Sequence, residues 1–254
     1  MPDHPLGPGA AARALAAAWQ LLAITLPGAW AREIGGALAV VSQAPIATLN
    51  GVWVIDDGAT RADVESGLDA VAATGLPHCL QLRPDSQDVL SAVPAQRGLI
   101  AEASVPLMAT ADPPALAPVP GLALRRLTPE EAPLHCEIAA EAFGAPVEVF
   151  TALVNPPVLA RPELRGYLGE VEGEPVVTAI GVLAGGAVGI FNVATVPSHQ
   201  GRGYGTASTA VALADGIEAG ASWGWLQSSE SGYGVYRRLG FQTLEWWDCW
   251  VTPP

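Results

Sequence analysis

The sequence contains no lysine, and all twelve of its basic residues are arginine. This excludes a P-loop nucleotide-binding protein, because the phosphate-binding loop of that class requires a lysine. Charged residues make up only 15% of the chain, and the net charge is −13. Nucleic-acid binding depends on basic side chains that neutralise phosphates, so we expect no nucleic-acid partner.

Cysteine is also scarce, with three residues that lie far apart in the sequence: Cys79, Cys136 and Cys249. An odd number at such spacing fits neither a disulfide framework nor a zinc site. We therefore expect reduced, buried thiols, no metal and a cytoplasmic location.

Apolar runs long enough to span a membrane are missing, so no membrane partner is expected. The N-terminal stretch ARALAAAWQLLAITLPGAWA raises two interpretations, a signal peptide and an ordinary first helix. Its larger apolar residues, Leu15, Trp19, Leu22 and Ile24, roughly follow helical spacing. The helix is the favoured interpretation.

Hydrophobic residues are abundant and make up half of the chain, enough to form a sizeable core. The length of 254 residues suits one large or two small domains. The segment ATADPPALAPVPG, residues 109–121, is rich in proline and typical of a stiff linker. We predict a domain at 1–110, a linker at 111–121 and a second domain at 122–254.

The second domain has the pattern of an α/β (α+β) fold with a mixed sheet. Thr128, Pro129 and Glu131 are typical of a helix start. We predict strands from 122 and at 164–173, 174–186, 187–196, 223–229 and 241–252, with helices at 129–143, 203–219 and 231–240.

The stretch HQGRGYGTAS, residues 199–208, stands between a predicted strand and a predicted helix. Gly201, Gly203 and Gly205 remove side chains that would block a ligand and permit positive φ. The helix that follows offers unpaired N–H groups and the positive end of its dipole. Together with Arg202 they predict an anion cradle suited to phosphate.

The cradle differs from a dinucleotide-binding loop, since its spacing is G-x-G-x-G and Thr206 stands where a third glycine would fall. Its context instead resembles the GNAT N-acetyltransferase superfamily. Gln200, Gly203 and Gly205 match the family's Q/R-x-x-G-x-G/A loop, which Pro197 precedes at the usual spacing. Downstream, YRRLGF at 236–241 matches the family's Y-x-x-x-G-F signature. The resemblance covers residues 122–254.

The resemblance implies a GNAT fold with splayed central strands and acetyl-CoA as cofactor. It implies that the backbone of Thr195 and Val196 pairs with the pantetheine arm and that Tyr236 protonates the departing thiolate. The alternative for Tyr236 is a packing residue. Ser229 stands where the family often has an asparagine that contacts the cofactor. The pyrophosphate would be held by Gln200, Gly201, Arg202, Gly203, Tyr204, Gly205 and Thr206.

No residue stands out as a general base. Five candidates, Glu141, Glu170, Glu172, Glu174 and His199, are interpreted as ordinary surface residues, and Asn192 could only orient a water. A water chain is compatible with the resemblance.

The first domain is interpreted as a degenerate, non-catalytic copy of the same fold, with a coincidental α/β pattern as the alternative. Leu80-Gln81 and RGL at 97–99 parallel Leu226-Gln227 and LGF at 239–241. The segment DDGATRAD, residues 56–63, carries acidic residues where the cradle would be.

The sequence thus predicts an acetyl-CoA-dependent N-acetyltransferase that acts on a small-molecule or protein amine and releases coenzyme A. The alternative is a catalytically silent CoA-binding sensor or scaffold. We expect a monomer or homodimer.

Overall fold

The computed structural model describes residues 6–112 and 118–254, so part of the predicted linker, residues 113–117, lies outside the described residues. The chain divides into two compact units. One consists of residues up to Met108 together with Gln227–Glu230 and Thr243–Pro254, and the other of Ala109–Leu226 and Ser231–Gln242. The division at 108/109 lies beside the predicted linker, but two C-terminal segments belong to the first unit.

The first unit contains strands in the order β1-β2-β3-β4-β11-β5. β1, β2 and β3 pair antiparallel, β3 and β4 pair parallel, and β11 lies antiparallel to β4. The last strand of the chain is therefore an internal strand of this unit. The bounds are β1 (Trp30–Ile34), β2 (Ala37–Val41), β3 (Asn50–Val54), β4 (Cys79–Leu82), β5 (Ile100–Thr110) and β11 (Gln242–Val251).

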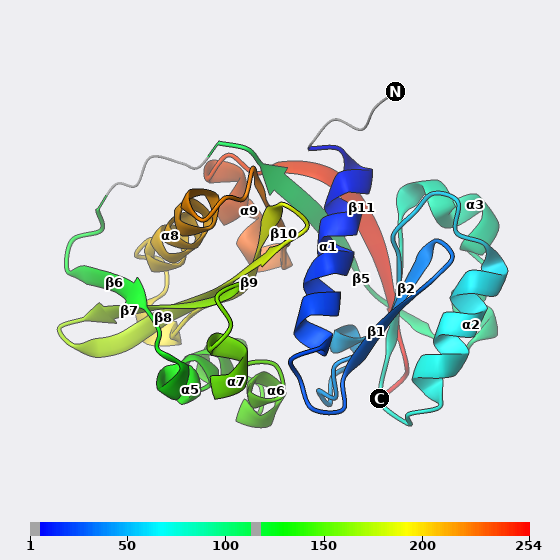
Figure 1. Ribbon diagram of the computed structural model, residues 1–254, viewed down its shortest axis with the longest axis horizontal. Coiled ribbons are helices and arrows are strands. Elements are labelled where there is room, and N and C mark those ends of the chain that lie inside the picture. The colour runs from blue at the N-terminus through cyan, green and yellow to red at the C-terminus, as the bar shows by residue number, and fades with distance from the viewer. Residues whose placement is uncertain (1–5, 113–117) are drawn as a thin grey trace. The chain divides into compact units, whose positions relative to one another are not determined.

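Helices α1 (Pro8–Ala23) and α2 (Arg61–Ala72) cover opposite faces of these strands (Figure 1). Val52 and Leu68 belong to the core on the α2 face, whereas the Trp53 ring lies 5.5 Å from the Trp19 ring of α1. The predicted first helix is confirmed, except that Ile24 follows its end and is 73% exposed. The remaining short helices are η1 (Ala47–Leu49), η2 (Pro84–Ser86), α3 (Gln87–Leu90) and α4 (Val93–Gln96).

The second unit contains strands in the order β10-β9-β8-β7-β6. Neighbours pair antiparallel except β9 and β10, which are parallel. The strands and helices predicted between 122 and 252 occur in the predicted order, with most of the last strand, β11, in the first unit. The strands are β6 (Leu122–Arg126), β7 (Leu164–Val171), β8 (Glu174–Ala184), β9 (Ala187–Thr195) and β10 (Gly224–Gln227). The helices are η3 (Pro129–Glu131), α5 (Ala132–Phe143), α6 (Val147–Thr151), α7 (Pro156–Leu159), η4 (Pro197–His199), α8 (Tyr204–Glu218) and α9 (Glu230–Arg238).

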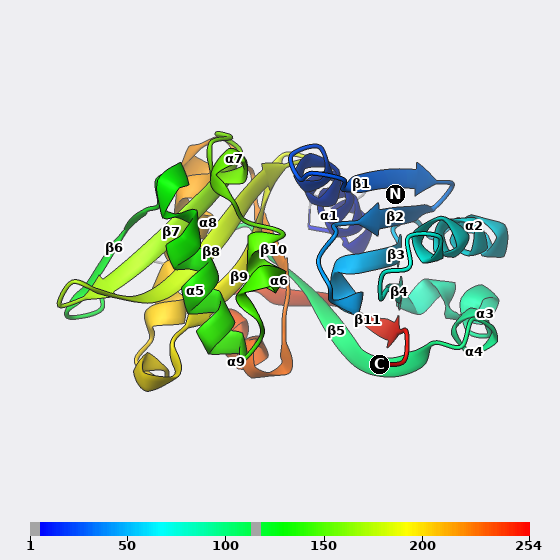
Figure 2. The same cartoon turned by 90° about the horizontal axis from the view of Figure 1, so that it is seen from below.

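In the second unit α5 and α8 lie on opposite faces of β7, β8 and β9, as both ribbon views show (Figures 1 and 2). The predicted capping box of Thr128 and Glu131 is present where this helical region begins. On the α8 face, Gly216 and Gly224 permit close packing, because a Cβ at either position would lie within 2.6 Å of Val188 or Leu213.

The two halves of the chain repeat one topology. In each, three antiparallel strands, β1–β3 and β7–β9, are followed by a helix that crosses to a parallel strand, a shorter helical segment and a long final strand, and β6 is an additional strand of the second half. β3, α2 and β4 thereby correspond to β9, α8 and β10. The predicted degenerate GNAT-like copy in the first half is consistent with this repetition.

A buried ion pair anchors the final strand in the first unit. Arg83, the residue after β4, donates two hydrogen bonds to the Glu245 carboxylate of β11, at 3.0 and 2.8 Å. The Trp247 indole N–H donates to the same carboxylate at 2.7 Å, and Asp57 also pairs with Arg83. Arg83, Glu245 and Trp247 are buried, so these partners satisfy charges that water cannot reach.

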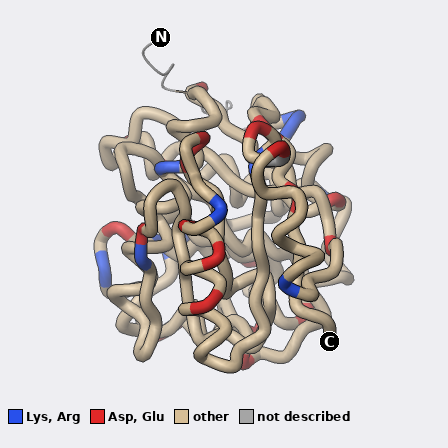
Figure 3. Tube along the Cα trace, turned by 90° about the vertical axis from the view of Figure 1, so that its right-hand side faces the viewer, with Lys and Arg blue, Asp and Glu red and all other residues tan. Residues whose placement is uncertain are grey.

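All three cysteines are buried and free, as predicted. In the part of the chain that the structure describes, no helix is long and apolar enough to cross a membrane. On the face drawn in Figure 3, acidic and basic positions are interspersed along the trace.

We predict that Glu245→Gln lowers the free energy of unfolding by about 3 kcal/mol, because it removes the main partner of a buried guanidinium. Urea denaturation followed by circular dichroism measures the change. Asp69→Asn is the control, since it breaks the exposed pair with Arg97 and should cost less than about 1 kcal/mol. Equal losses in the two variants would show that Glu245 does not anchor β11.

Candidate functional site

The predicted cradle connects β9 to α8 through η4. Gln200 is extended, and Gly201 and Gly203 have φ of 76° and 83°, in the left-handed region that glycine tolerates. A Cβ added at either glycine would have no atom within 4 Å, so both face open space. The backbone conformation, and not packing, therefore requires glycine at these two positions.

The N-terminus of α8 is open. Gly203 precedes the first residue of α8 without a side-chain cap, and the first turn carries no acidic residue. Ala207 makes the first helical hydrogen bond, to the Gly203 carbonyl at 3.0 Å, so the N–H groups of Tyr204, Gly205 and Thr206 precede the ladder. These donors and the helix dipole favour an anion in front of the helix.

The side chains of the cradle leave its backbone accessible. Tyr204 is buried and its ring stacks 6.2 Å from that of His199, so this tyrosine packs inward. Arg202 is exposed and donates to the Ser198 carbonyl at 3.2 Å. It has no carboxylate partner among the described residues. Its charge is therefore available at the entrance.

β9 and β10 separate after a short paired stretch. Parallel pairing joins Val188 to Gly224 and Gly189 to Trp225, and within the described residues it goes no further. β9 continues to Thr195, so its last six residues have β8 on one side and no strand of this unit on the other. The splayed strands that the resemblance implied are thus present, with the cradle at the same end.

A bulge interrupts β9 inside the splayed stretch. Ile180 of β8 faces Phe191 and Thr178 faces Ala194, so Asn192 and Val193 oppose one residue. Asn192 has φ of 47°, which is uncommon for a non-glycine residue. The bulge turns part of the β9 backbone out of the ladder with β8.

Thr195 and Val196, the two residues predicted to pair with the pantetheine arm, differ in the hydrogen-bond partners of their backbone groups. The Val196 N–H donates to the Val176 carbonyl at 3.0 Å, and its own carbonyl accepts from His199. The Thr195 carbonyl instead accepts from the Gln200 side-chain amide at 3.1 Å, on the side away from β8. The Thr195 carbonyl is therefore held by a side chain, whereas both backbone groups of Val196 have backbone partners.

Tyr236 lies on α9, which follows the carboxyl end of β10. Its ring packs edge to face on Phe241 at 6.0 Å, and its hydroxyl has no protein partner among the described residues. Burial raises the pKa of Tyr236 to about 12, so the phenol keeps its proton at neutral pH. Ser229 is exposed and belongs to the segment Gln227–Glu230 of the first unit, so its predicted cofactor contact stays a prediction.

The sequence analysis overlooked His135 of α5, which is fully buried. Its Nδ1 lies 2.7 Å from the Thr178 hydroxyl of β8, and burial lowers its pKa to about 4. In the sequence His135 is a single histidine within a predicted helix, and no motif indicates that it is buried against Thr178. Among the described residues no group of three or more His, Cys, Asp and Glu side chains could hold a metal ion.

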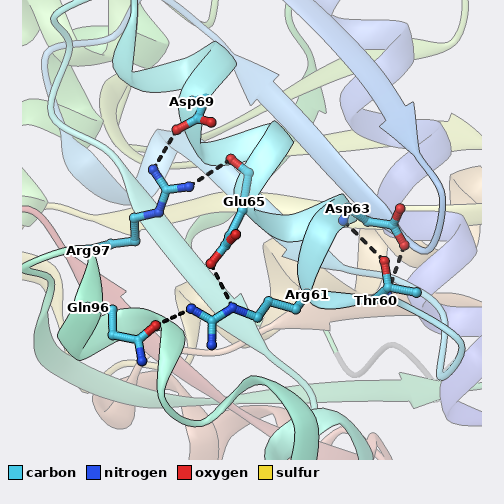
Figure 4. A network of polar contacts seen from close by, with 7 residues as sticks. All are labelled: Thr60, Arg61, Asp63, Glu65, Asp69, Gln96 and Arg97. Carbon is cyan, nitrogen blue, oxygen red and sulfur yellow. Dashed lines mark hydrogen bonds and ion pairs between the residues drawn. The ribbon is translucent and has the colours of Figure 1, made fainter.

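The corresponding helix of the first half is closed by its own side chains (Figure 4). Thr60 and Asp63 form a capping box at the start of α2, with hydrogen bonds of 2.8 and 3.2 Å. The hydrogen bond from the Thr60 N–H holds the pKa of Asp63 below its usual range. Glu65 accepts a hydrogen bond from Arg61 on the same helix, so the arginine of this first turn already has a carboxylate partner.

The strands of the first half do not splay either. β3 and β4 pair at three successive positions up to Trp53 and Gln81. β3 ends one residue later, at Val54. Because Thr60 and Asp63 cap α2 and β3 stays paired with β4, the described residues combine an uncapped helix N-terminus with splayed parallel strands only at α8, β9 and β10.

Comparison with known proteins agrees with this geometry. Residues 133–241 match the model of the acetyltransferase (GNAT) family. The matched region contains the cradle, the splayed strands and α9. A search of curated proteins finds no match.

Solved structures of similar fold cover most of the chain. A GCN5-related N-acetyltransferase from Kribbella flavida has a TM-score of 0.72 and 22% identity, with 96% of each chain covered. A GCN5-related N-acetyltransferase from Sphaerobacter thermophilus has a TM-score of 0.64 and 19% identity, covering 85% of this chain and 76% of the other. A putative GNAT-family acetyltransferase from Novosphingobium aromaticivorans has a TM-score of 0.56 and 15% identity, with 98% of each covered. These likenesses show that the fold extends over both halves.

We predict that Gly203→Asp lowers the affinity for acetyl-CoA at least about tenfold, because it places a carboxylate against the anion and strains a left-handed backbone. Isothermal titration calorimetry measures the affinity. Gly220→Asp is the matched control, since Gly220 has φ of 105°, faces open space and follows the opposite end of α8. Equal affinities in the two variants would remove the cradle from the binding site.

Proposed function

We propose that this acyltransferase, whose residues 133–241 match the acetyltransferase (GNAT) family model, uses acetyl-CoA to acetylate an amine of a small molecule or protein. The observation that carries the proposal is the open, glycine-capped N-terminus of α8 beside the splayed ends of β9 and β10. Bound acetyl-CoA would supply an acetyl group on a thioester. The chain's own residues would bind the cofactor and donate a proton to the departing thiolate.

The cradle would hold the pyrophosphate. The N–H groups of Tyr204, Gly205 and Thr206 point out of the first turn of α8, and Gly201 and Gly203 leave the approach open. Arg202 would add a charge-assisted hydrogen bond at the entrance. Two negative charges would thereby be held without a lysine or a metal ligand from this loop.

The splayed stretch of β9 would hold the pantetheine arm. Its amide groups can pair with a strand-like arm through Thr195, whose carbonyl now accepts only the Gln200 side chain. Val196 contributes packing, since its backbone groups are already paired. N–H groups that the bulge turns out of the ladder can stabilise negative charge on the thioester oxygen during transfer.

Tyr236 would be the general acid. Its phenol keeps its proton at neutral pH because burial raises its pKa to about 12, and the departing thiolate requires a proton. Since no group of the described residues binds the hydroxyl, its proton is free to be donated. Ser229 would contact the cofactor, as the sequence predicts.

The first half would be non-catalytic. Its counterpart of the cradle is capped by Thr60 and Asp63, and its parallel strands stay paired. Its contribution to the enzyme is the rest of the sheet into which β11 inserts, directly after Phe241 and the helix that carries Tyr236.

We predict that Tyr236→Phe lowers kcat and kcat/KM together by at least about tenfold, because general acid catalysis contributes about 10²- to 10⁴-fold. The affinity for acetyl-CoA should change little, since the ring and its packing on Phe241 remain. Thiol release from acetyl-CoA, followed across a library of amines, measures turnover. Tyr233→Phe, one turn earlier on α9, is the matched control.

Two results would contradict this account. If Tyr236→Phe is as active as wild type from pH 6 to 9, water protonates the thiolate and Tyr236 only packs. If the wild type binds acetyl-CoA but acetylates none of the amines, the protein is a CoA-binding sensor.

A further inference from the structure

The exposure of β9 changes at the point where β10 leaves it. Residues 187–190, at the start of the strand, are buried, whereas the next three, 191–193, are partly exposed. The last pair that joins the two strands in the described residues is Gly189 with Trp225. We call this pair the vertex of the splayed strands. The accessible stretch of β9 thus begins two residues beyond the vertex.

Two aromatic rings close the vertex on one face of the sheet. The rings of Phe191 and Trp225 meet edge to face, with their centroids 5.4 Å apart. A Cβ added at Gly189 would lie 2.7 Å from an atom of each ring, so both rings lie directly over this glycine. Trp225 is 1% exposed, whereas Phe191 is partly exposed and belongs to the accessible stretch. Glycine at 189 therefore permits an aromatic wall where the strands separate.

The other face of the vertex is packed against α8. A Cβ at Gly216 would lie 2.6 Å from Val188, and a Cβ at Gly224 would lie 2.3 Å from Leu213. Val188 and Gly224 each precede a vertex residue, and successive side chains of a strand point to opposite faces. The two aromatic rings therefore lie on the α5 face. On the α8 face Leu226, beyond the vertex, is 1% exposed, so helix packing fills that side.

We propose that Phe191 and Trp225 form the end wall for the acyl group of the donor and restrict the donor to short acyl groups such as acetyl. This inference rests on the proposed function, in which the cradle holds the pyrophosphate and the pantetheine arm follows β9 toward the vertex. Thr195, beside the cradle, and Phe191 are four residues apart, which is about 13 Å along a strand. The acyl carbons at the leading end of the arm would therefore meet the two rings.

A longer acyl chain would have to displace one of these rings. Trp225 is fixed, because its ring is buried and packs over Gly189. Phe191 can move only by giving up its edge-to-face contact with Trp225. Apolar sites that are filled to normal density resist extra methylene groups, and a single methylene can change selectivity by about 10- to 200-fold. The wall would thereby determine the acyl chain length of the donor.

Calorimetry with CoA, acetyl-CoA and hexanoyl-CoA tests the wall by binding alone, without turnover. We expect the wild type to bind hexanoyl-CoA at least about tenfold more weakly than acetyl-CoA. In Phe191→Ala, which removes the movable ring, the two affinities should lie within about threefold of each other, because the acyl chain can enter the vacated space. The affinity for CoA, which has no acyl group, should be the same in both proteins.

Phe143→Ala is the matched control. Phe143 also belongs to an aromatic pair of the second unit, since it stacks on Phe150 at 5.8 Å, but it lies at the end of α5 and is 52% exposed. This variant loses a ring and an aromatic contact and should keep the wild-type preference for acetyl-CoA over hexanoyl-CoA.

Phe191→Trp tests the wall in the opposite direction and does not leave a cavity. Its larger ring should weaken the binding of acetyl-CoA relative to CoA, because only acetyl-CoA carries a group that reaches the wall. Retained binding of CoA shows in each variant that the fold and the cradle are intact.

The outcomes separate this inference from the proposed function. If the wild type binds CoA, but binds hexanoyl-CoA as tightly as acetyl-CoA, the end wall is wrong and the cofactor site stands. The same conclusion follows if Phe143→Ala loses the preference as Phe191→Ala does, or if Phe191→Trp leaves the ratio of acetyl-CoA to CoA affinity unchanged. Absence of CoA binding by the wild type would overturn the proposed function and this inference together.

Discussion

A helix N-terminus must find acceptors for its first N–H groups, and the two halves of this chain solve that problem differently. At α2, Thr60 and Asp63 supply the acceptors from within the helix. At α8, Gly203 supplies none, and the helix begins beside the stretch of β9 that β10 does not pair. Because the topology is the same in both halves, this difference in capping, together with the separation of β9 from β10, distinguishes the candidate ligand site from its closed counterpart at α2.

The second constraint is the position of the last strand, β11, which pairs with β4 of the first unit although it follows the second unit in the sequence. β11 completes the sheet of the first unit, where Arg83 binds Glu245 in a buried, bidentate ion pair. The segment immediately before it carries α9 and Tyr236 in the second unit. The first half therefore cannot be removed without leaving β11 unpaired, which explains why a half without an open site would be retained.

Much of the second unit could be predicted from sequence because local signals decide it. The strand alternation, the Thr128 capping box and the glycine spacing each predict a structure that the chain adopts. Three features carried no such signal. The insertion of β11 beside β4 depends on pairing between distant segments, the paired backbone of Val196 depends on register with β8, and His135 reads as an ordinary position in an apolar helix. Ile24 follows the helical spacing, yet α1 ends one residue before it.

In the proposed function, one of two topologically equivalent helix N-termini binds the cofactor. The number of acetyl-CoA molecules bound per full-length chain tests this most directly, measured by calorimetry with native mass spectrometry as the independent count. The capped α2 and the paired β3 and β4 predict a stoichiometry of one. A stoichiometry of two would show that self-capping does not close the first half, and no binding at all would contradict the assignment of the cradle.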